Sequence, residues 1–166
     1  MLLLLMKAAA FSQGKYPVAK AYAYSQKEIS GINRKVMDKD GKIIRGKNTS
    51  THYHLYLECY AGKEIVVDNV WINGQTYKVD VKKTESPVTV SSGIKGVKTN
   101  QSETLVPQTS NNVMAILPGD VDEVKVDKKI SKLIKNNAVL FAYSFNGKKY
   151  YLAVNSLKEI TPEVNQ

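Results

Sequence analysis

Two histidines and a glutamate lie close together between residues 46 and 58, and residues of these types bind metal ions. His52, His54 and Glu58 are at even-numbered positions, so in a β-strand their side chains would lie on one face. Two imidazoles and a carboxylate on one face could bind iron, manganese or zinc and leave coordination positions open for a substrate. The three residues therefore support one hypothesis for the chain, a metal-dependent enzyme with a divalent transition metal as its cofactor.

The spacing of these residues resembles the first motif of the cupin family. Gly46 is followed by five residues, then by His52 and His54, and after three more residues by Glu58. The resemblance implies a cupin-like, metal-dependent enzyme that uses His52, His54 and Glu58. Two parts of the cupin pattern are absent from the sequence: Ile65 stands where the motif has a glycine, and the chain has no third histidine.

The opposite face of the same segment is more apolar, and we expect it to point into the core. Its residues are Tyr53, Leu55, Leu57 and Cys59. The histidine face would then meet solvent, a partner protein or a second layer of the fold. On that face Tyr56 and Tyr60 are candidate interface residues, because tyrosine is enriched at protein interfaces. Cys59 is expected in the core and not as a nucleophile, since the histidines that could activate it point the other way.

Four two-residue turn signals divide the chain into short strands, a pattern typical of β-hairpins. They are Asp40-Gly41, Ala61-Gly62, Asn73-Gly74 and Asn146-Gly147. The middle two predict an antiparallel meander of three strands over residues 52–60, 65–72 and 76–83. The first and last predict hairpins that join residues 34–37 to 42–45 and residues 138–145 to 149–155. In the last hairpin the alternation predicts a more apolar face, on which Val139, Phe141, Tyr143 and Phe145 oppose Tyr150, Leu152 and Val154.

A further strand is expected over residues 16–24, with Val18, Tyr22 and Tyr24 on one face and three alanines on the other. Residues 86–101 show little periodicity and are expected to form a surface loop or a loose edge strand.

Only one helix is expected, near residues 128–135. Asp127 can cap its first turn, and Ile130, Leu133 and Ile134 fall on one face. Many short strands with a single short helix predict an all-β fold, which is either an antiparallel β-sandwich or a barrel-like sheet.

The chain is strongly basic, with 24 Lys and Arg against 15 Asp and Glu and a net charge of +9. Such a surface attracts polyanions. The lysines are spread along the chain, and only two residues are arginines, whereas proteins that read nucleic acid rely on arginine. The composition therefore argues against a nucleic-acid partner and leaves binding of an acidic, polyanionic glycan as a further alternative function.

The N-terminal sequence MLLLLMKAAAFSQGK has an apolar run followed by small residues, the pattern of the second half of a secretory signal peptide. A cut between Ser12 and Gln13 would separate a signal remnant, residues 1–12, from a single β-rich domain, residues 13–166. The apolar run is too short for a membrane span, which needs about 20 residues. We therefore expect no transmembrane span and a periplasmic, cell-surface-associated or secreted protein.

A second resemblance covers most of the chain. Its features are the cleavage pattern before Gln13, Val-Trp-Ile-Asn-Gly at 70–74, Leu-Val-Pro at 105–107 and Phe-Asn-Gly-Lys-Lys-Tyr-Tyr at 145–151. In this order they are similar to small exported envelope proteins of Bacteroidetes, a group with no agreed function, and the resemblance assigns no site residues. The leading hypothesis is a non-catalytic binding or assembly module that docks on another envelope or outer-membrane protein through its sheet edges and its tyrosine-rich face.

Overall fold

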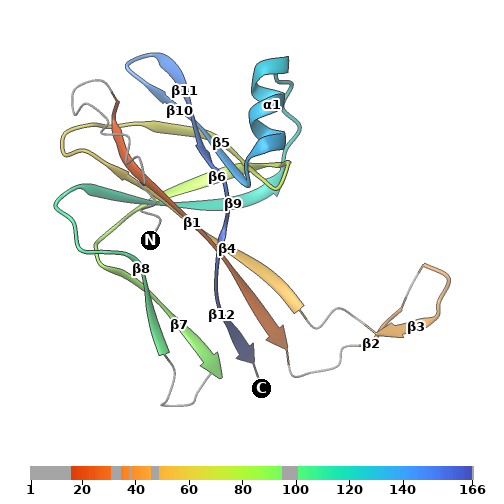
Figure 1. The fold of residues 1–166 in the computed structure, drawn as a ribbon. Coiled ribbons are helices and arrows are strands. Elements are labelled where there is room, and N and C mark those ends of the chain that lie inside the picture. The colour runs from red at the N-terminus through yellow and green to blue at the C-terminus, as the bar shows by residue number, and fades with distance from the viewer. Residues whose placement is uncertain (1–15, 31–34, 38, 46–48, 95–100, 166) are drawn as a thin grey trace, which may run out of the picture.

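The computed structural model describes residues 16–30, 35–37, 39–45, 49–94 and 101–165. These residues form a strand-rich fold with one helix, α1 (Lys128–Asn136) (Figure 1). The strands are β1 (Val18–Ser30), β2 (Lys35–Met37), β3 (Ile43–Arg45), β4 (Thr49–Cys59), β5 (Val66–Ile72), β6 (Gln75–Thr84), β7 (Val88–Ile94), β8 (Gln101–Val106), β9 (Asn112–Val121), β10 (Val139–Phe145), β11 (Lys148–Val154) and β12 (Lys158–Asn165).

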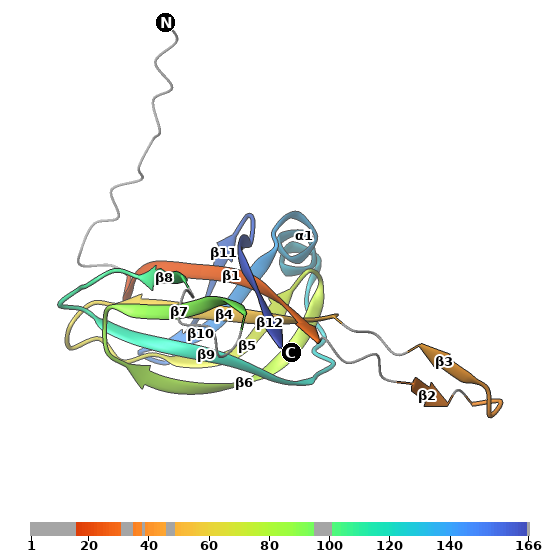
Figure 2. The same cartoon turned by 90° about the horizontal axis from the view of Figure 1, so that it is seen from below.

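Ten of the strands form one sheet in the order β11-β10-β5-β6-β9-β4-β1-β12-β7-β8, and β2 and β3 form a separate hairpin. Most neighbours are antiparallel, but β12 runs parallel to both β1 and β7. The sheet curls so far that β11, at one end of the order, comes close to β1, the seventh strand (Figure 2). The curled sheet is a half-barrel, which confirms the predicted all-β, barrel-like fold with one short helix.

The concave side of the half-barrel contains the main core. Strands β4, β5, β9 and β10 each contribute every second residue to it, as a pleated strand requires. Its most deeply buried members are Leu55, Leu57, Cys59, Val70, Ile72, Ile116, Val139 and Phe141. The odd-numbered residues of β4 therefore point inward, as the sequence predicts.

Two outer layers cover parts of the convex side. Strands β7, β8 and β12 cover β1 and β4, where Leu105, Val106 and Ile160 pack on Tyr22 and Tyr56. The helix α1 covers β5 and β10, and there Ile130 packs on residues that include Trp71 and Leu140. Figure 1 shows α1 at the upper right and the β7–β8 pair at the lower left of the sheet.

The predicted helix is confirmed together with its cap. The backbone N–H of Ile130 donates to Oδ1 of Asp127 over 2.8 Å, which satisfies one of the free N–H groups at the helix start. At the other end, Nδ2 of Asn137 donates to the carbonyl of Leu133 over 2.8 Å.

Three of the four turn signals join paired strands, namely β2 to β3, β5 to β6 and β10 to β11. In the last two turns Asn73 and Asn146 have φ of 49°, and the glycine that follows each also has a positive φ. This is the geometry that two-residue hairpins favour. The predicted cross-strand partners of the last hairpin are also confirmed, since Phe141 faces Leu152 and Tyr143 faces Tyr150.

The predicted three-strand meander is wrong at the Ala61-Gly62 turn. The chain reverses there, with Gly62 at φ 75°, but β4 and β5 do not pair. Instead β9 lies between β4 and β6, and β5 pairs with β10 and β6. A turn signal is local and fixes only the reversal of the chain, whereas the choice of neighbour depends on segments that are distant in sequence.

Two smaller expectations also change. A register shift between Val18 and Lys20 places Val18 in the main core together with Ala23, and not on the outer face with Tyr22 and Tyr24. Such a bulge moves one residue to the opposite face. Part of the segment expected as a loop or loose edge strand forms β7, which lies inside the strand order between β12 and β8.

Residues 1–15, with the predicted signal sequence and its cleavage point, lie outside the described residues. Among the residues that are described, no helix combines the length and the apolar character that crossing a membrane requires.

Candidate functional site

His52, His54 and Glu58 share the convex face of β4, but the structure gives each of them a different partner. Nε2 of His52 lies 2.5 Å from Oε2 of Glu28, and Nε2 of His54 lies 3.0 Å from Oε1 of Gln26. The carboxylate of Glu58 bonds to groups at the other end of the strand. Within the described ranges, no three His, Cys, Asp or Glu side chains are grouped as a metal site requires.

Glu58 accepts hydrogen bonds from three groups and is only 8% exposed. The donors are the hydroxyl of Tyr22 (2.8 Å), Oγ1 of Thr109 (2.7 Å) and Nδ2 of Asn111 (2.7 Å). Burial raises the pKa of Glu58, but the hydrogen bonds from Asn111, Thr109 and Tyr22 outweigh it and leave the pKa below its usual value. The carboxylate is therefore charged at neutral pH and fastens the segment before β9 to the outer face of β4.

His54 sits in a more enclosed position than His52. Burial lowers the pKa of His54, and the neighbouring His52 lowers it further. A neutral imidazole must donate from Nε2 to reach the carbonyl oxygen of Gln26. The pair of histidines therefore consists of one imidazole bonded to a carboxylate and one bonded to an amide.

The two candidate interface tyrosines differ in exposure. Tyr56 is buried beneath the outer layer, in the cluster that contains Leu105 and Val106. Tyr60 follows β4 and is half-buried, and its backbone N–H donates to the carbonyl of Pro17 over 3.0 Å. Within the single chain, Tyr56 thus packs on β8.

A different part of the molecule leaves strand edges open. Strand β1 pairs with β4 on one side, but on its other side β12 begins only opposite Tyr24, so no described strand pairs with residues 18–23 there. In the described part of the chain, strand β11 pairs with β10 alone. The curl of the sheet brings these two open edges close to each other. We call the gap between residues 18–23 of β1 and strand β11 the seam.

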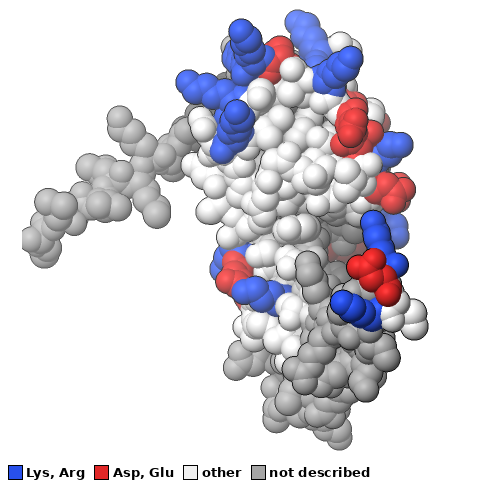
Figure 3. All heavy atoms as spheres, turned by 90° about the vertical axis from the view of Figure 1, so that its right-hand side faces the viewer, with Lys and Arg blue, Asp and Glu red and all other residues white. Residues whose placement is uncertain are grey.

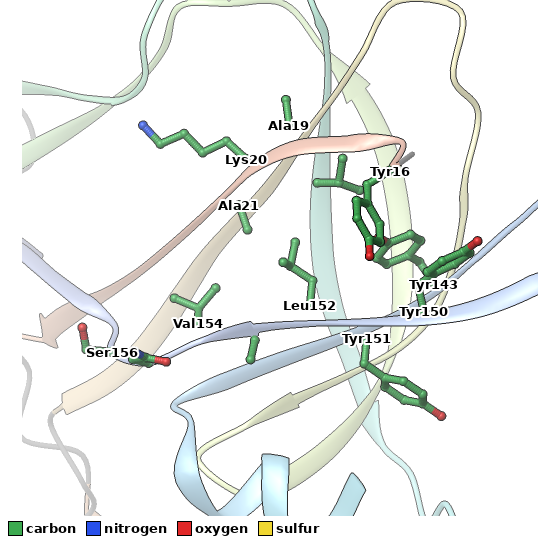
Figure 4. Close-up of a pocket in the computed structure, with 13 residues that line it drawn as sticks. Tyr16, Ala19, Lys20, Ala21, Tyr143, Tyr150, Tyr151, Leu152, Val154 and Ser156 are labelled. Atoms are coloured by element: carbon green, nitrogen blue, oxygen red, sulfur yellow. The ribbon is translucent and has the colours of Figure 1, made fainter. Parts of the chain in front are cut away.

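The seam contains a hollow of about 610 Å³. Figure 4 shows Ala21 pointing from β1 toward Leu152 and Val154 of β11. At one end of the hollow the rings of Tyr143 and Tyr150 are stacked with centroids 5.6 Å apart, and Tyr16 meets Tyr150 edge to face at 6.3 Å. Lys20 is the one charged side chain among the described residues that line the hollow. The hollow is therefore an apolar and aromatic cleft with a lysine at its rim.

The register of β11 shows which backbone groups face the seam. Because Asn146-Gly147 is a two-residue turn, Phe145 and Lys148 beside it exchange backbone hydrogen bonds. Pairing then alternates along the strand, so three residues direct their N–H and C=O groups away from β10. They are Lys149, Tyr151 and Ala153. No described strand pairs with them, and their backbone groups remain available to an added strand.

Sequence reasoning predicted both strands of the seam but not that they meet. The alternation in residues 138–155 predicted that Leu152 and Val154 lie on the more apolar face, and the alanines of β1 were expected together on one face of that strand. The curl of the sheet that brings these segments together depends on the pairing of β9 with β4 and β6, which no local pattern in the sequence indicates.

The chain matches no family model, no curated protein and no solved structure. Its class is therefore defined by its own fold and site: a half-barrel with a partial outer layer and two open edges that face each other across an apolar hollow.

Proposed function

We propose that the protein is a non-catalytic binding module that accepts an extended segment of another envelope protein at the seam. The observation that carries this proposal is the pair of open strand edges on either side of a hollow. An added strand gains backbone hydrogen bonds from the edge of β11, while the pocket beside it receives alternate side chains. Each such hydrogen bond contributes about 1 kcal/mol net, so several together give useful affinity.

The chemistry of the seam specifies the kind of segment. The residues of β11 that face the hollow are Tyr150, Leu152 and Val154, so a strand added beside them would place apolar side chains at every second position. None of the described residues that line the hollow carries a carboxylate, and both Lys20 at its rim and Lys148 at the start of β11 are exposed. A segment that is neutral or acidic, with alternate apolar residues, complements this surface.

The proposed compartment rests on a separate argument. The small-residue pattern before Gln13 and the apolar run before it are typical of an exported chain. Export would place the seam in the periplasm or at the cell surface, where extended segments of other envelope proteins are available as partners.

Selection of peptides from a random display library against the purified protein tests the proposal. We expect the enriched peptides to alternate apolar and polar residues. On binding, amide hydrogen exchange should slow at Lys149, Tyr151 and Ala153. Exchange that slows elsewhere and not on β11 would refute the proposed site.

A matched pair of variants separates backbone pairing from loss of fold. Ala153→Pro removes an N–H that faces away from β10, so the β10–β11 ladder keeps its hydrogen bonds, and an edge strand tolerates proline at such a position. Ala153→Ser keeps the N–H. We expect peptide affinity to fall at least tenfold in Ala153→Pro and to stay within twofold in Ala153→Ser. Equal affinities in the two variants would contradict strand addition at β11.

A further inference from the structure

The exposed side of α1 carries a stripe of lysines. Lys128, Lys132 and Lys135 lie opposite the buried face of the helix, which Ile130 anchors to the sheet. The stripe spans seven residue steps, or about 10 Å at the helical rise. The three lysines line a shallow depression on the surface together with Val126, Asp127, Ser131 and Asn136, and the carboxylate of Asp127 is engaged there as the cap of the helix. Figure 3 shows Lys and Arg side chains gathered at the upper end of the molecule, at the level of α1 in Figure 1.

Most of these charges are arranged unfavourably for the helix itself, although Lys135 lies in the last turn, where the helix dipole favours a basic residue. Lys128 and Lys129 occupy the first turn, where the helix dipole favours acidic residues, and no acidic residue lies in that turn. Lys132 follows Lys128 by four positions and precedes Lys135 by three, and like charges at these spacings repel. Among the described carboxylates, none forms an ion pair with the stripe.

An aromatic ring lies beside the helix on the same side of the sheet. Tyr151 of β11 is 37% exposed, and its ring is 6.5 Å from that of Trp71, on which α1 packs. Figure 4 shows Tyr151 projecting from β11 on the opposite side from Leu152 and Val154. Its free ring face can stack on the C–H groups of a sugar ring.

We infer that the lysine stripe of α1, together with Tyr151 on the strand next to β10, binds a linear polysaccharide that carries carboxylate or sulfate groups. A sequence that breaks local rules of helix stability without a structural gain points to a functional site. A polyanion would neutralise the mutual repulsion of the lysines, and lysine binds such groups as a point charge. The site shares Tyr151 with the open edge of β11, but it uses the ring of that residue whereas strand addition uses its backbone, and it does not depend on the function proposed for the seam.

Two other classes of polyanion fit the surface less well. An anionic membrane would require apolar side chains that are free to insert beside the lysines, but Ile130 is buried and Leu133 and Ile134 pack against the sheet. Nucleic acid is bound best where arginine forks and several stacking rings are available, and the helix has no arginine.

Titration of the protein with polygalacturonate and with heparin tests the inference. The two probes distinguish carboxylate from sulfate, and dextran serves as the uncharged polysaccharide. We expect polygalacturonate or heparin to bind, dextran not to bind, and the affinity to fall steeply as salt is raised. The triple variant Lys128→Gln/Lys132→Gln/Lys135→Gln should lower this affinity at least tenfold, and Tyr151→Ala at least threefold.

The control variant Lys78→Gln/Lys82→Gln/Lys83→Gln removes the same charge from exposed positions on β6. It should change the affinity less than threefold. Because the helix variant relieves repulsion, its melting temperature should stay equal to that of the wild type or rise, so a loss of binding would not reflect unfolding. Equal losses in both triple variants would overturn the inference, as would binding of single-stranded DNA or phosphatidylglycerol vesicles without binding of either polysaccharide.

Discussion

The two halves of β1 differ in whether a neighbouring strand pairs with them on the side away from β4. From Tyr24 onward β12 runs beside it in parallel, and the buried amide of Gln26 donates to the carbonyls of Thr161 (3.1 Å) and Ser91 (3.3 Å). Over residues 18–23 none of the described strands pairs on that side, and a hollow lies there instead. The chain thus supplies its own neighbour for one half of the strand and leaves the other half open to a partner.

We expect the largest difference in stability between a core position in the middle of the sheet and a position beside the seam. Leu57 is fully buried in the middle of β4, whereas Leu152 is half-buried beside the seam. We expect Leu57→Ala to lower the free energy of unfolding by about 3 kcal/mol and Leu152→Ala by about 1 kcal/mol, because a cavity costs more where the surroundings cannot collapse into it. Urea denaturation measures both values, and equal losses would show that the seam is packed as tightly as the core.

Much of this contrast could be predicted from the sequence. Alternation of apolar residues in β4, β10 and β11 predicted their inward faces, and the Asn-Gly turns predicted two hairpins together with the register of the second. These signals are local, since each depends on residues that are close in the chain. The pairing of β4 with β9 joins residues more than 50 positions apart and had no such signal.

The site residues show the same limit. The sequence placed His52, His54 and Glu58 on one face of a strand, and the structure agrees. It could not show that Tyr22, Thr109 and Asn111 meet Glu58, because these donors come from two segments that are distant from Glu58 in the chain. The seam was missed for the same reason, since its two edges meet only when seven strands have curled.

A substitution of Glu58 tests whether its hydrogen bonds stabilise the part of β4 that the outer layer covers. We expect Glu58→Gln to lower the free energy of unfolding at pH 7 by about 2 kcal/mol, because a charged acceptor with three donors is replaced by a neutral one. Thr51→Val, on an exposed part of the same strand, is a control that should change stability by less than about 0.5 kcal/mol.

The effect of Glu58 should also depend on pH. Its pKa in the folded protein lies below the usual glutamate value, so its contribution to stability is present above that usual value and is lost as the pH falls through the folded pKa. The difference between the wild type and Glu58→Gln should therefore shrink in acid. A difference that stays constant from pH 7 to pH 3 would mean that the charge of Glu58 contributes nothing.

Gln26 tests the bonds that hold the outer strands to β1. Gln26→Ala removes its bonds to Thr161 and Ser91 and leaves those carbonyls without this donor. We expect a loss of about 1.5 kcal/mol in thermal unfolding, against almost none for Gln75→Ala at an exposed position on β6. We expect faster amide exchange in Gln26→Ala to be confined to β7 and β12. Exchange that increases equally in β11 would show that Gln26 does not hold the outer strands in particular.

The smallest effect on stability is expected from the titration of His54, which lies at the edge of the outer layer. Burial lowers the pKa of its imidazole, so the folded state favours the neutral form. Its contribution to stability is present above the usual histidine pKa of about 6.5 and is lost as the pH falls through the lower, folded value. In an NMR titration we expect the midpoint of His54 to lie below that of a histidine in an unfolded peptide. Ile160→Ala should raise this midpoint, because a cavity under β12 loosens the outer layer and hydrates the ring, while the bond of His54 to Gln26 is kept. A midpoint that is unchanged by Ile160→Ala would show that the outer strands do not shield His54 from water.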